Sequence, residues 1–222
     1  MEHYYVIPDI HGCNRLLQKA LAEIRWQNSE GGKIIFLGDY IDRGEDNLGV
    51  IKTVMNPPEK WEFVCLLGNH ERIFTDAYFR KSSFYDYEAA KDLAGFPRND
   101  YAIYDHVHHR INRNIIEWMD NLKLFHVEDQ NVFVHAYYDD TKSPDQQDES
   151  TCVWQRMGDF ETYHNDKQRL YMVHGHTPRK NGPIKSPNRL NLDCGAVFYN
   201  RLVVAKFQKN VQGAVEFLEF TE

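Results

Sequence analysis

The chain has 222 residues, 42% of them hydrophobic, and a formal net charge of −7 at neutral pH. This length buries enough apolar surface for one α/β domain, so we expect residues 1–222 to form a single domain. The acidic balance argues against general binding to nucleic acid or to a membrane surface. Four cysteines without CxxC spacing and the lack of a long apolar or signal-type segment predict a cytoplasmic protein.

Short apolar runs alternate with helical patterns in the first 71 residues. Buried strands are predicted at Tyr4–Ile7, Ile34–Leu37 and Phe63–Leu67, each rich in β-forming residues. Helices are expected from Asn14, a candidate N-cap, and over residues 47–55. This alternation implies βαβ units with a parallel sheet, whose strands present their carboxyl ends at one edge.

Residues 72–122 have a different pattern, rich in charged and aromatic residues and without clear strands. We expect them to form a helical cap segment inserted beside the sheet, because their apolar positions keep helical spacing: Ile111, Ile115, Trp118, Met119 and Leu122. Further strands are predicted at 132–135, 171–173, 190–192, 201–207 and 214–220. Lys209, Asn210 and Gly213 predict a hairpin between the last two. The polar stretch 139–150 is expected to be a surface loop.

Five loops at the ends of these predicted strands carry residues that bind metals. They are DIHG (9–12), GDYIDRG (38–44), GNHE (68–71), VHA (134–136) and HGHT (174–177). Carboxylates, an amide oxygen and imidazoles suit divalent ions such as Mn²⁺, Fe²⁺ and Zn²⁺. One ion would not need so many ligands, whereas two ions about 3.5–4 Å apart would share a bridging carboxylate. The motifs therefore predict a dinuclear metal site.

This set of motifs resembles the calcineurin-like metallophosphoesterase superfamily, and within it the phosphoprotein phosphatase family. The chain looks most like the small bacterial and phage serine/threonine protein phosphatases, from Asp9 to about Phe198 and in family order. CVWQR (152–156) and LDCGAVF (192–198) also look like family segments. The resemblance implies an α/β fold of four layers, α/β/β/α, in which helices flank a central β-sandwich and a helical cap is inserted.

The resemblance also implies a role for each motif residue. Asp9 and His11 would hold the first metal, Asp39 would bridge both, and the second metal would be held by Asn69, His135 and His176. A metal-bridging hydroxide would attack phosphorus while the His70 imidazolium protonates the leaving oxygen. The remaining roles complete the set: Asp42 orients His70, and Arg43 and Arg156 clamp the phosphate oxygens.

One position departs from the wider superfamily. Many members carry a second histidine in a GHxH motif, and Pro178 takes that place here. This departure favours the protein-phosphatase branch over the nuclease and cyclic-nucleotide branches. It also leaves the first metal one protein ligand short, and we expect water to complete its coordination.

The resulting hypothesis is a metal-dependent phosphatase that hydrolyses phosphoserine and phosphothreonine in proteins or peptides. Two divalent ions are expected as cofactors, with Mn²⁺ implied by the family and iron or zinc allowed by the ligand types. We expect a monomer. The alternative hypothesis keeps the same metals in a symmetrical dinucleoside tetraphosphate hydrolase. A non-catalytic binding module is disfavoured because no ligand of the set is missing.

Three further features leave alternatives open. His174 is either a metal ligand or a residue that packs beside the site. The latter is favoured because Gly175 interrupts the strand geometry and the family pattern places the ligand at His176. Arg72 either reaches the phosphate or lies on the surface near a helix start. The cluster His106, His108 and His109 looks like a metal site, but it follows no strand end, so a solvated helix face is expected.

Overall fold

The computed structural model describes residues 2–80, 86–97, 99–156 and 170–222. A first sheet has the strand order β10-β9-β1-β2-β3, in which β1 pairs with β2 and β2 with β3 in parallel. Its strands are β1 (His3–Ile7), β2 (Gly32–Phe36), β3 (Trp61–Cys65), β9 (Arg201–Gln208) and β10 (Ala214–Thr221). The parallel pairs place the carboxyl ends of β1, β2 and β3 at one edge, as predicted.

A second sheet has the order β4-β5-β6-β8-β7, with β5, β6 and β8 parallel to one another. Its strands are β4 (Phe125–Glu128), β5 (Asn131–Val134), β6 (Tyr171–His174), β7 (Ile184–Ser186) and β8 (Arg189–Asn191). The edge strands β4 and β7 were not predicted. Both are short and only partly buried, so neither carries the apolar run by which a buried strand is found.

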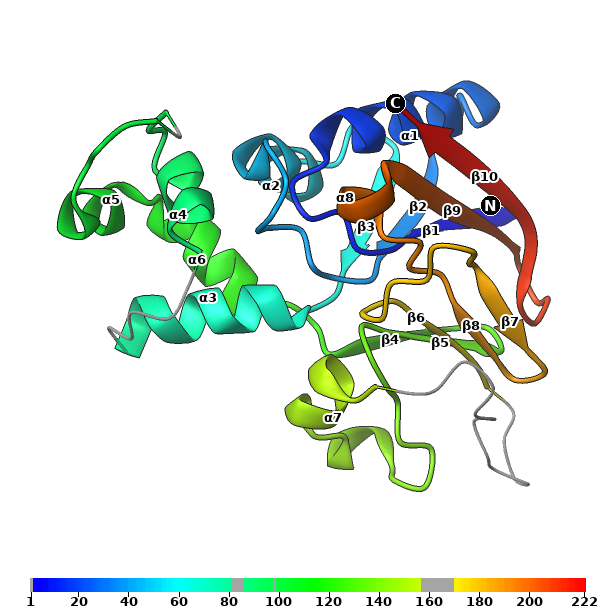
Figure 1. Ribbon diagram of the computed structural model, residues 1–222. Helices are drawn as coiled ribbons and strands as arrows, with labels where there is room; N and C mark the ends of the chain where they lie inside the picture. Colours follow the sequence, from blue (N-terminus) through cyan, green and yellow to red (C-terminus); the bar gives the residue numbers. More distant parts are fainter. Residues whose placement is uncertain (1, 81–85, 98, 157–169) are drawn as a thin grey trace.

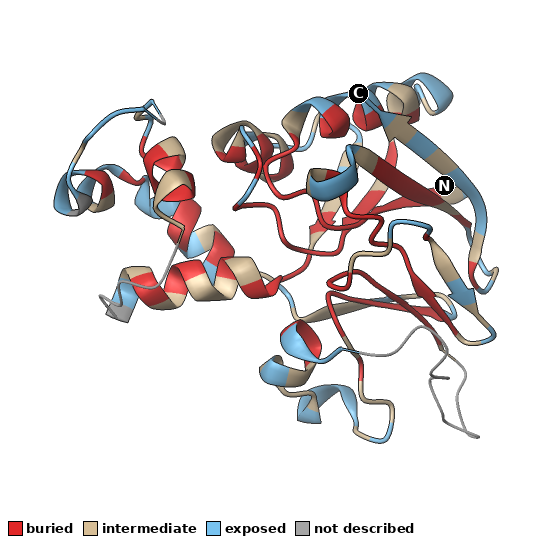
Figure 2. Cartoon of the chain, viewed as in Figure 1, coloured by how far each residue is buried: buried red, intermediate tan, exposed pale blue. Residues whose placement is uncertain are grey.

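The two sheets pack face to face and enclose an apolar core (Figures 1 and 2). Tyr4 of the first sheet stacks on Phe207 at a centroid distance of 5.4 Å and meets Phe133 of the second sheet edge-on at 5.9 Å. The outer layers are helical: α1 (Asn14–Gln27) and α2 (Asn47–Met55) on the first sheet, and α7 (Glu149–Trp154) on the second. This is the predicted α/β/β/α arrangement.

The cap consists of four helices beside the first sheet (Figure 1). They are α3 (Asn69–Arg80), α4 (Tyr87–Leu93), α5 (Tyr104–Arg110) and α6 (Arg113–Asp120). The helical spacing predicted from Ile111 onward is interrupted, because Ile111 ends α5 in an extended conformation. Asn112 then caps α6 by accepting the Asn114 N–H at 2.9 Å. Within α6, Ile115, Ile116 and Met119 are buried, so the predicted apolar face is confirmed there.

Two local predictions need correction. Asn14 is not the N-cap of α1, which is Cys13; the Asn14 amide instead donates to Asp46 at 2.5 Å and so links α1 to the loop before α2. The stretch 139–150 contains a short 3₁₀ helix, η1 (Pro144–Gln146), and the start of α7, which Asp148 caps by accepting the Thr151 N–H. Among the described residues, no helix has the length and apolar character needed to cross a bilayer.

Candidate metal centre

The ends of strands from both sheets meet around a cavity of about 230 Å³. Its wall contains most of the residues that the sequence predicted for the site: Asp9, His11, Asp39, Arg43, Asn69, His70, Arg156 and His176. His135 and Asp42 lie directly behind this wall, in contact with His176 and His70 respectively. The structure therefore brings all the predicted site residues together from six separate segments, which span 168 positions of sequence from Asp9 to His176.

The loops adopt backbone conformations that residues other than glycine rarely take. His11, Asp39 and His176 have φ values of 46°, 51° and 66°, in the left-handed region. Asp42 and Arg43 also lie there, at 72° and 68°. Such strain costs about 1–3 kcal/mol per residue and persists only where the surroundings enforce it. These turns direct the polar side chains into the cavity rather than along the sheet.

Glu71, which the sequence placed only within the GNHE motif, holds two of these loops in place. Its side chain is fully buried and accepts four backbone N–H groups. Oε1 accepts those of Tyr40 at 2.8 Å and Ile41 at 3.2 Å, while Oε2 accepts those of Asp39 at 2.9 Å and Gly68 at 3.2 Å. One carboxylate thus joins the end of β2 to the start of α3.

Four side chains converge on one point at the second-sheet side of the cavity. His135 Nε2 lies 3.1 Å from both Asn69 Oδ1 and His176 Nδ1, and 3.6 Å from Asp39 Oδ2. The other nitrogen of His135 lies 2.9 Å from the Leu37 carbonyl oxygen, to which it can only donate. His135 Nε2 therefore presents a lone pair to the amide oxygen of Asn69 and the Asp39 carboxylate. A cation among these acceptors would relieve their repulsion, so the donor set fits a divalent metal.

A second group of metal-type ligands consists of His11, Asp39 and His70. His11 Nδ1 donates to the Ile41 carbonyl oxygen at 2.8 Å, so Nε2 carries a lone pair and lies 3.4 Å from Asp39 Oδ2. Asp39 belongs to both groups, as a bridging ligand would. Asp9 belongs to neither group, and both of its carboxylate oxygens accept the backbone N–H of His176 at 3.1 Å. Asp9 nevertheless lines the same cavity.

Burial sets the charge state of these groups in the metal-free chain. It lowers the pKa of His11 to about 3 and that of His176 to about 4, which leaves both imidazoles neutral with a lone pair available. Burial, together with neighbouring carboxylates, raises the pKa of Asp9, and burial raises the pKa of Asp193 to about 7. The metal-free cavity thus disfavours the charged forms of Asp9 and Asp193, and a bound cation would favour them.

His70 and Asp42 form the pair that was predicted to act as an acid. His70 Nδ1 lies 2.5 Å from Asp42 Oδ2. Burial lowers the pKa of His70, but the hydrogen bond to Asp42 and the charge of Asp39 outweigh it, so the pKa is raised overall. The protonated form of His70 is therefore favoured, as a group that donates a proton requires.

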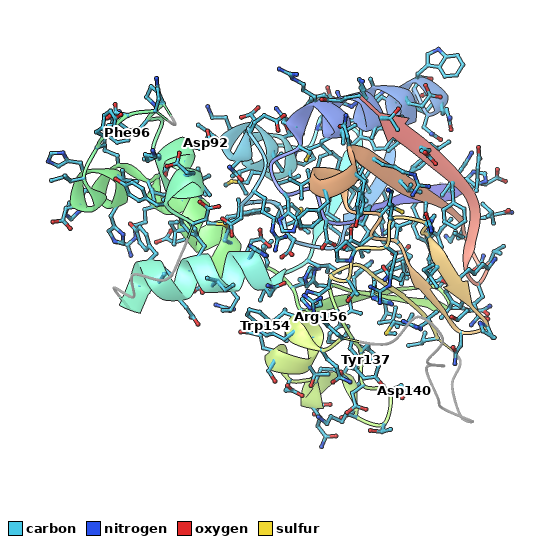
Figure 3. The ribbon with its side chains drawn as sticks, in the orientation of Figure 1. Asp92, Phe96, Tyr137, Asp140, Trp154 and Arg156 are labelled. Carbon is cyan, nitrogen blue, oxygen red and sulfur yellow. The ribbon has the colours of Figure 1, made fainter. Side chains whose placement is uncertain are left out.

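Two arginines line the cavity, from different parts of the fold. The Arg43 guanidinium donates to His11 Nε2, its Nη2 lies 2.9 Å from His70 Nε2, and it lies 5.4 Å from the ring centroid of Phe198. Arg156 is exposed and follows α7, where Figure 3 labels it beside Trp154. Both guanidinium groups can reach an anion in the cavity.

The structure also distinguishes between the alternatives that the sequence left open for Arg72 and His174. Arg72 pairs with Asp120 at 2.7 Å and with Glu149 at 2.8 Å, so it links α3, α6 and α7 and does not line the cavity. His174 accepts from Arg189 Nη1 at 3.1 Å and is not part of either group of metal-type ligands.

The predicted solvated face of α5 is only partly correct. His106 and His109 are exposed, whereas His108 is partly buried and stacks on Tyr78 at a centroid distance of 4.3 Å. Among the described residues, these three histidines form no group of metal-type ligands.

Sequence reasoning assigned no role to two other residues of the cavity wall, Asp193 and Phe198. Both lie in the segment LDCGAVF after β8. Asp193 is 2% exposed, whereas Phe198 is 54% exposed and lies in the short helix α8 (Ala196–Tyr199). The available signal was their position after a short apolar strand, which is also the position of every predicted metal ligand.

Comparisons with known proteins agree with this geometry. The family model for calcineurin-like phosphoesterases matches residues 3–209. Serine/threonine-protein phosphatase 1 of Salmonella typhimurium is 27% identical over 217 residues, which cover 93% of this chain and 92% of the relative. An asymmetrical bis(5'-nucleosyl)-tetraphosphatase of Oceanobacillus iheyensis is 24% identical over 227 residues, which cover 91% and 87%. A solved structure named provisionally as a diadenosine tetraphosphatase has the same fold, with a TM-score of 0.68 at 16% identity over 99% of this chain and 93% of that one.

Proposed function

This chain belongs to the calcineurin-like phosphoesterase family, and from that premise we propose its substrate and the roles of its residues. The family uses a dinuclear metal site, and the protein is a hydrolytic phosphoesterase. We propose that it removes phosphate from phosphoserine and phosphothreonine in proteins or peptides. The observation that carries this choice is the hydrogen-bonded pair of His70 and Asp42 at the cavity.

The leaving group is the reason for that choice. A serine or threonine alkoxide is a strong base and leaves readily only if a proton reaches it in the transition state. The nucleotide expelled from a dinucleoside tetraphosphate leaves through a phosphate oxygen, which is a far weaker base and needs no such help. A histidine whose pKa is raised by Asp42 is thus most useful with an alkyl phosphate substrate.

The metal ligands are proposed as the motifs predicted them. Asp9 and His11 would hold the first ion, Asp39 both, and Asn69, His135 and His176 the second. When bound, two divalent ions polarise a phosphoryl oxygen and make water nucleophilic near neutral pH. Mn²⁺ is proposed, since the nitrogen and oxygen ligands suit it, although they also suit iron or zinc.

The protein's own residues would bind and orient the substrate. Arg43 and Arg156 would each hold phosphate oxygens, and the planar guanidinium groups favour two parallel hydrogen bonds. His70 would donate its proton to the leaving oxygen, held in place by Asp42. The cavity admits a phosphoryl group, so the remainder of the substrate would lie along its rim, beside Phe198, which lines the cavity and is 54% exposed.

A dinucleoside tetraphosphate hydrolase is the second candidate. It is supported by the relative from Oceanobacillus iheyensis and by the exposed ring of Phe198 in the cavity wall, on which a nucleobase can stack. The sequence suggested the symmetrical type, whereas this relative is named as asymmetrical. The products of diadenosine tetraphosphate distinguish the two, since symmetrical cleavage gives two ADP and asymmetrical cleavage gives ATP and AMP.

Side-by-side turnover of a phosphoserine peptide and diadenosine tetraphosphate with Mn²⁺ tests the proposal. We expect a higher kcat/KM for the peptide, and we expect His70→Asn to slow peptide hydrolysis far more than hydrolysis of the dinucleotide. A preference for the dinucleotide by orders of magnitude would overturn the protein-phosphatase assignment. A cytoplasmic location, a monomer and a single domain stay predictions.

A further inference from the structure

Asp193 is a buried carboxylate in the wall of the metal cavity that has no place among the proposed ligands. It follows β8 at the end where the strands present their polar residues, and its side chain is 2% exposed. It faces the same cavity as Asp9, His11 and Asp39. A Cβ placed on Gly175 would lie 2.1 Å from Asp9 Oδ1 and 3.8 Å from Asp193 Cβ, so these two aspartates flank the same glycine.

The chain around Asp193 fixes the direction of this carboxylate. The Asp193 N–H donates to Asn191 Oδ1 at 3.0 Å, and its carbonyl oxygen accepts the Arg179 N–H at 3.0 Å. Asp193 Oδ1 accepts the Gly195 N–H at 2.8 Å. Gly195 has φ 70°, and a Cβ there would lie 2.8 Å from the Tyr199 ring, so only glycine allows this turn. The carboxylate is therefore held in the wall by several contacts.

Asp193 lies beside Asp9, which is proposed to hold the first metal, and by the same proposal that metal is one protein ligand short. Pro178 also lines the cavity and has no donor atom in its side chain. Asp193 is absent from both compact groups of metal-type ligands, as Asp9 is, but unlike Asp9 it is not among the ligands that the motifs predict. A buried negative charge that does not touch the ion still attracts a cation strongly, because little water screens it.

We propose that Asp193 is a positioning residue for the first metal. From outside the ligand ring, its carboxylate supplies negative charge beside Asp9 and thereby sets how tightly this position holds a divalent ion. The inference rests on the proposed metal assignment. The opposing explanation is that Asp193 only shapes the turn by accepting the Gly195 N–H.

The substitution Asp193→Asn separates these explanations, since asparagine keeps an oxygen that can accept the Gly195 N–H but carries no charge. Titration of metal-free protein with Mn²⁺ in a calorimeter should show one of two binding steps weakened roughly 10- to 100-fold, the usual effect of an outer partner of a metal ligand. The other step should be unchanged. His11→Asn and His135→Asn, one for each position, identify which step is affected.

A matched control removes the same charge elsewhere. Asp92 on α4 accepts the N–H groups of Asn47 and Leu48 and does not line the cavity (Figure 3). Asp92→Asn should leave both Mn²⁺ affinities unchanged. If it weakened Mn²⁺ binding as much as Asp193→Asn does, the effect would be one of overall charge and the inference would fail.

Thermal unfolding gives a second readout that a purely structural role would not produce. Without metal, the carboxylates of Asp9, Asp39 and Asp193 repel one another in one cavity. The Asp193→Asn variant should therefore unfold at a higher temperature than the natural chain in EDTA. The rise in Tm on adding Mn²⁺ should be smaller than for the natural chain. Asp193→Ser, which also removes the charge, provides the same comparison if the asparagine variant is not recovered folded.

Two results would overturn the inference: two Mn²⁺ binding steps of natural affinity in the charge-free variants, or a lower Tm in EDTA together with an unchanged Mn²⁺-induced rise. If instead the natural chain itself bound no divalent ion, the proposed function would fail first. The binding experiment on the natural chain therefore distinguishes failure of the inference about Asp193 from failure of the proposed function.

Discussion

The substitution Glu71→Gln tests how the loops of the site are held. Each of the two carboxylate oxygens of Glu71 accepts two backbone N–H groups. Three of these four groups come from the loop after β2, and one comes from the residue before α3. Glutamine keeps one oxygen and replaces the other with an NH₂ group, which can only donate. Whichever way the amide turns, two buried N–H groups would face another donor.

The expected loss follows from these two groups. A buried donor left without an acceptor costs about 1–3 kcal/mol, so two of them cost about 2–6 kcal/mol in the free energy of unfolding. The total free energy of unfolding of a domain is roughly 5–15 kcal/mol, so this substitution would remove a large part of the stability. The change in volume is negligible, so no cavity contributes to the loss.

Urea unfolding in EDTA measures this loss without a contribution from bound metal. Glu62→Gln is the matched control, because Glu62 is an exposed partner of Lys33 at 3.5 Å. We expect that control to change the free energy of unfolding by less than about 0.5 kcal/mol. A Glu71→Gln variant as stable as the control would show that Glu71 does not hold these loops together.

Three further predictions concern the chemistry of the site. His70→Asn should lower kcat on a phosphoserine peptide by roughly 10²- to 10⁴-fold while both ions stay bound, since His70 is proposed to donate a proton; a natural rate would remove His70 from the mechanism. Asp39→Asn should reduce metal content at both positions, because Asp39 belongs to both ligand groups; elemental analysis that finds two ions per chain would refute the bridging role. Gly175→Ala should weaken Mn²⁺ binding at the first position, because its Cβ would lie 2.1 Å from Asp9 Oδ1 and displace that carboxylate; calorimetry that shows natural affinity would contradict this placement of Asp9.

The sequence alone was enough to predict where the central strands end and which polar residues follow them. Runs such as Ile34–Leu37 are apolar and rich in β-forming residues, so their burial and strand conformation are predictable. Parallel pairing then places Asp9, Asp39 and Asn69 at one edge of the first sheet. Convergence with His135 and His176 depends on the packing of the two sheets, which the family resemblance implied and local patterns alone do not contain.

What remained hidden depends on contacts between backbone groups and single side chains. Glu71 and Asp193 both stand in motifs that the sequence displayed, but their partners are N–H groups of loops in left-handed conformations, which no periodicity reveals. The break between α5 and α6 was hidden for a similar reason, since one cap by Asn112 interrupts an apolar pattern that continues across it. Edge strands with few apolar residues were hidden because their burial is low.

The central claim is that the convergent side chains hold two ions on which phosphate ester hydrolysis depends. The most direct test strips the protein with a chelator, restores Mn²⁺ in steps, and follows both the ions bound per chain and the hydrolysis of a phosphoserine peptide. The account predicts negligible turnover without metal and full turnover when two ions are bound per chain. A stripped protein that hydrolyses the peptide as fast as the loaded one would contradict it.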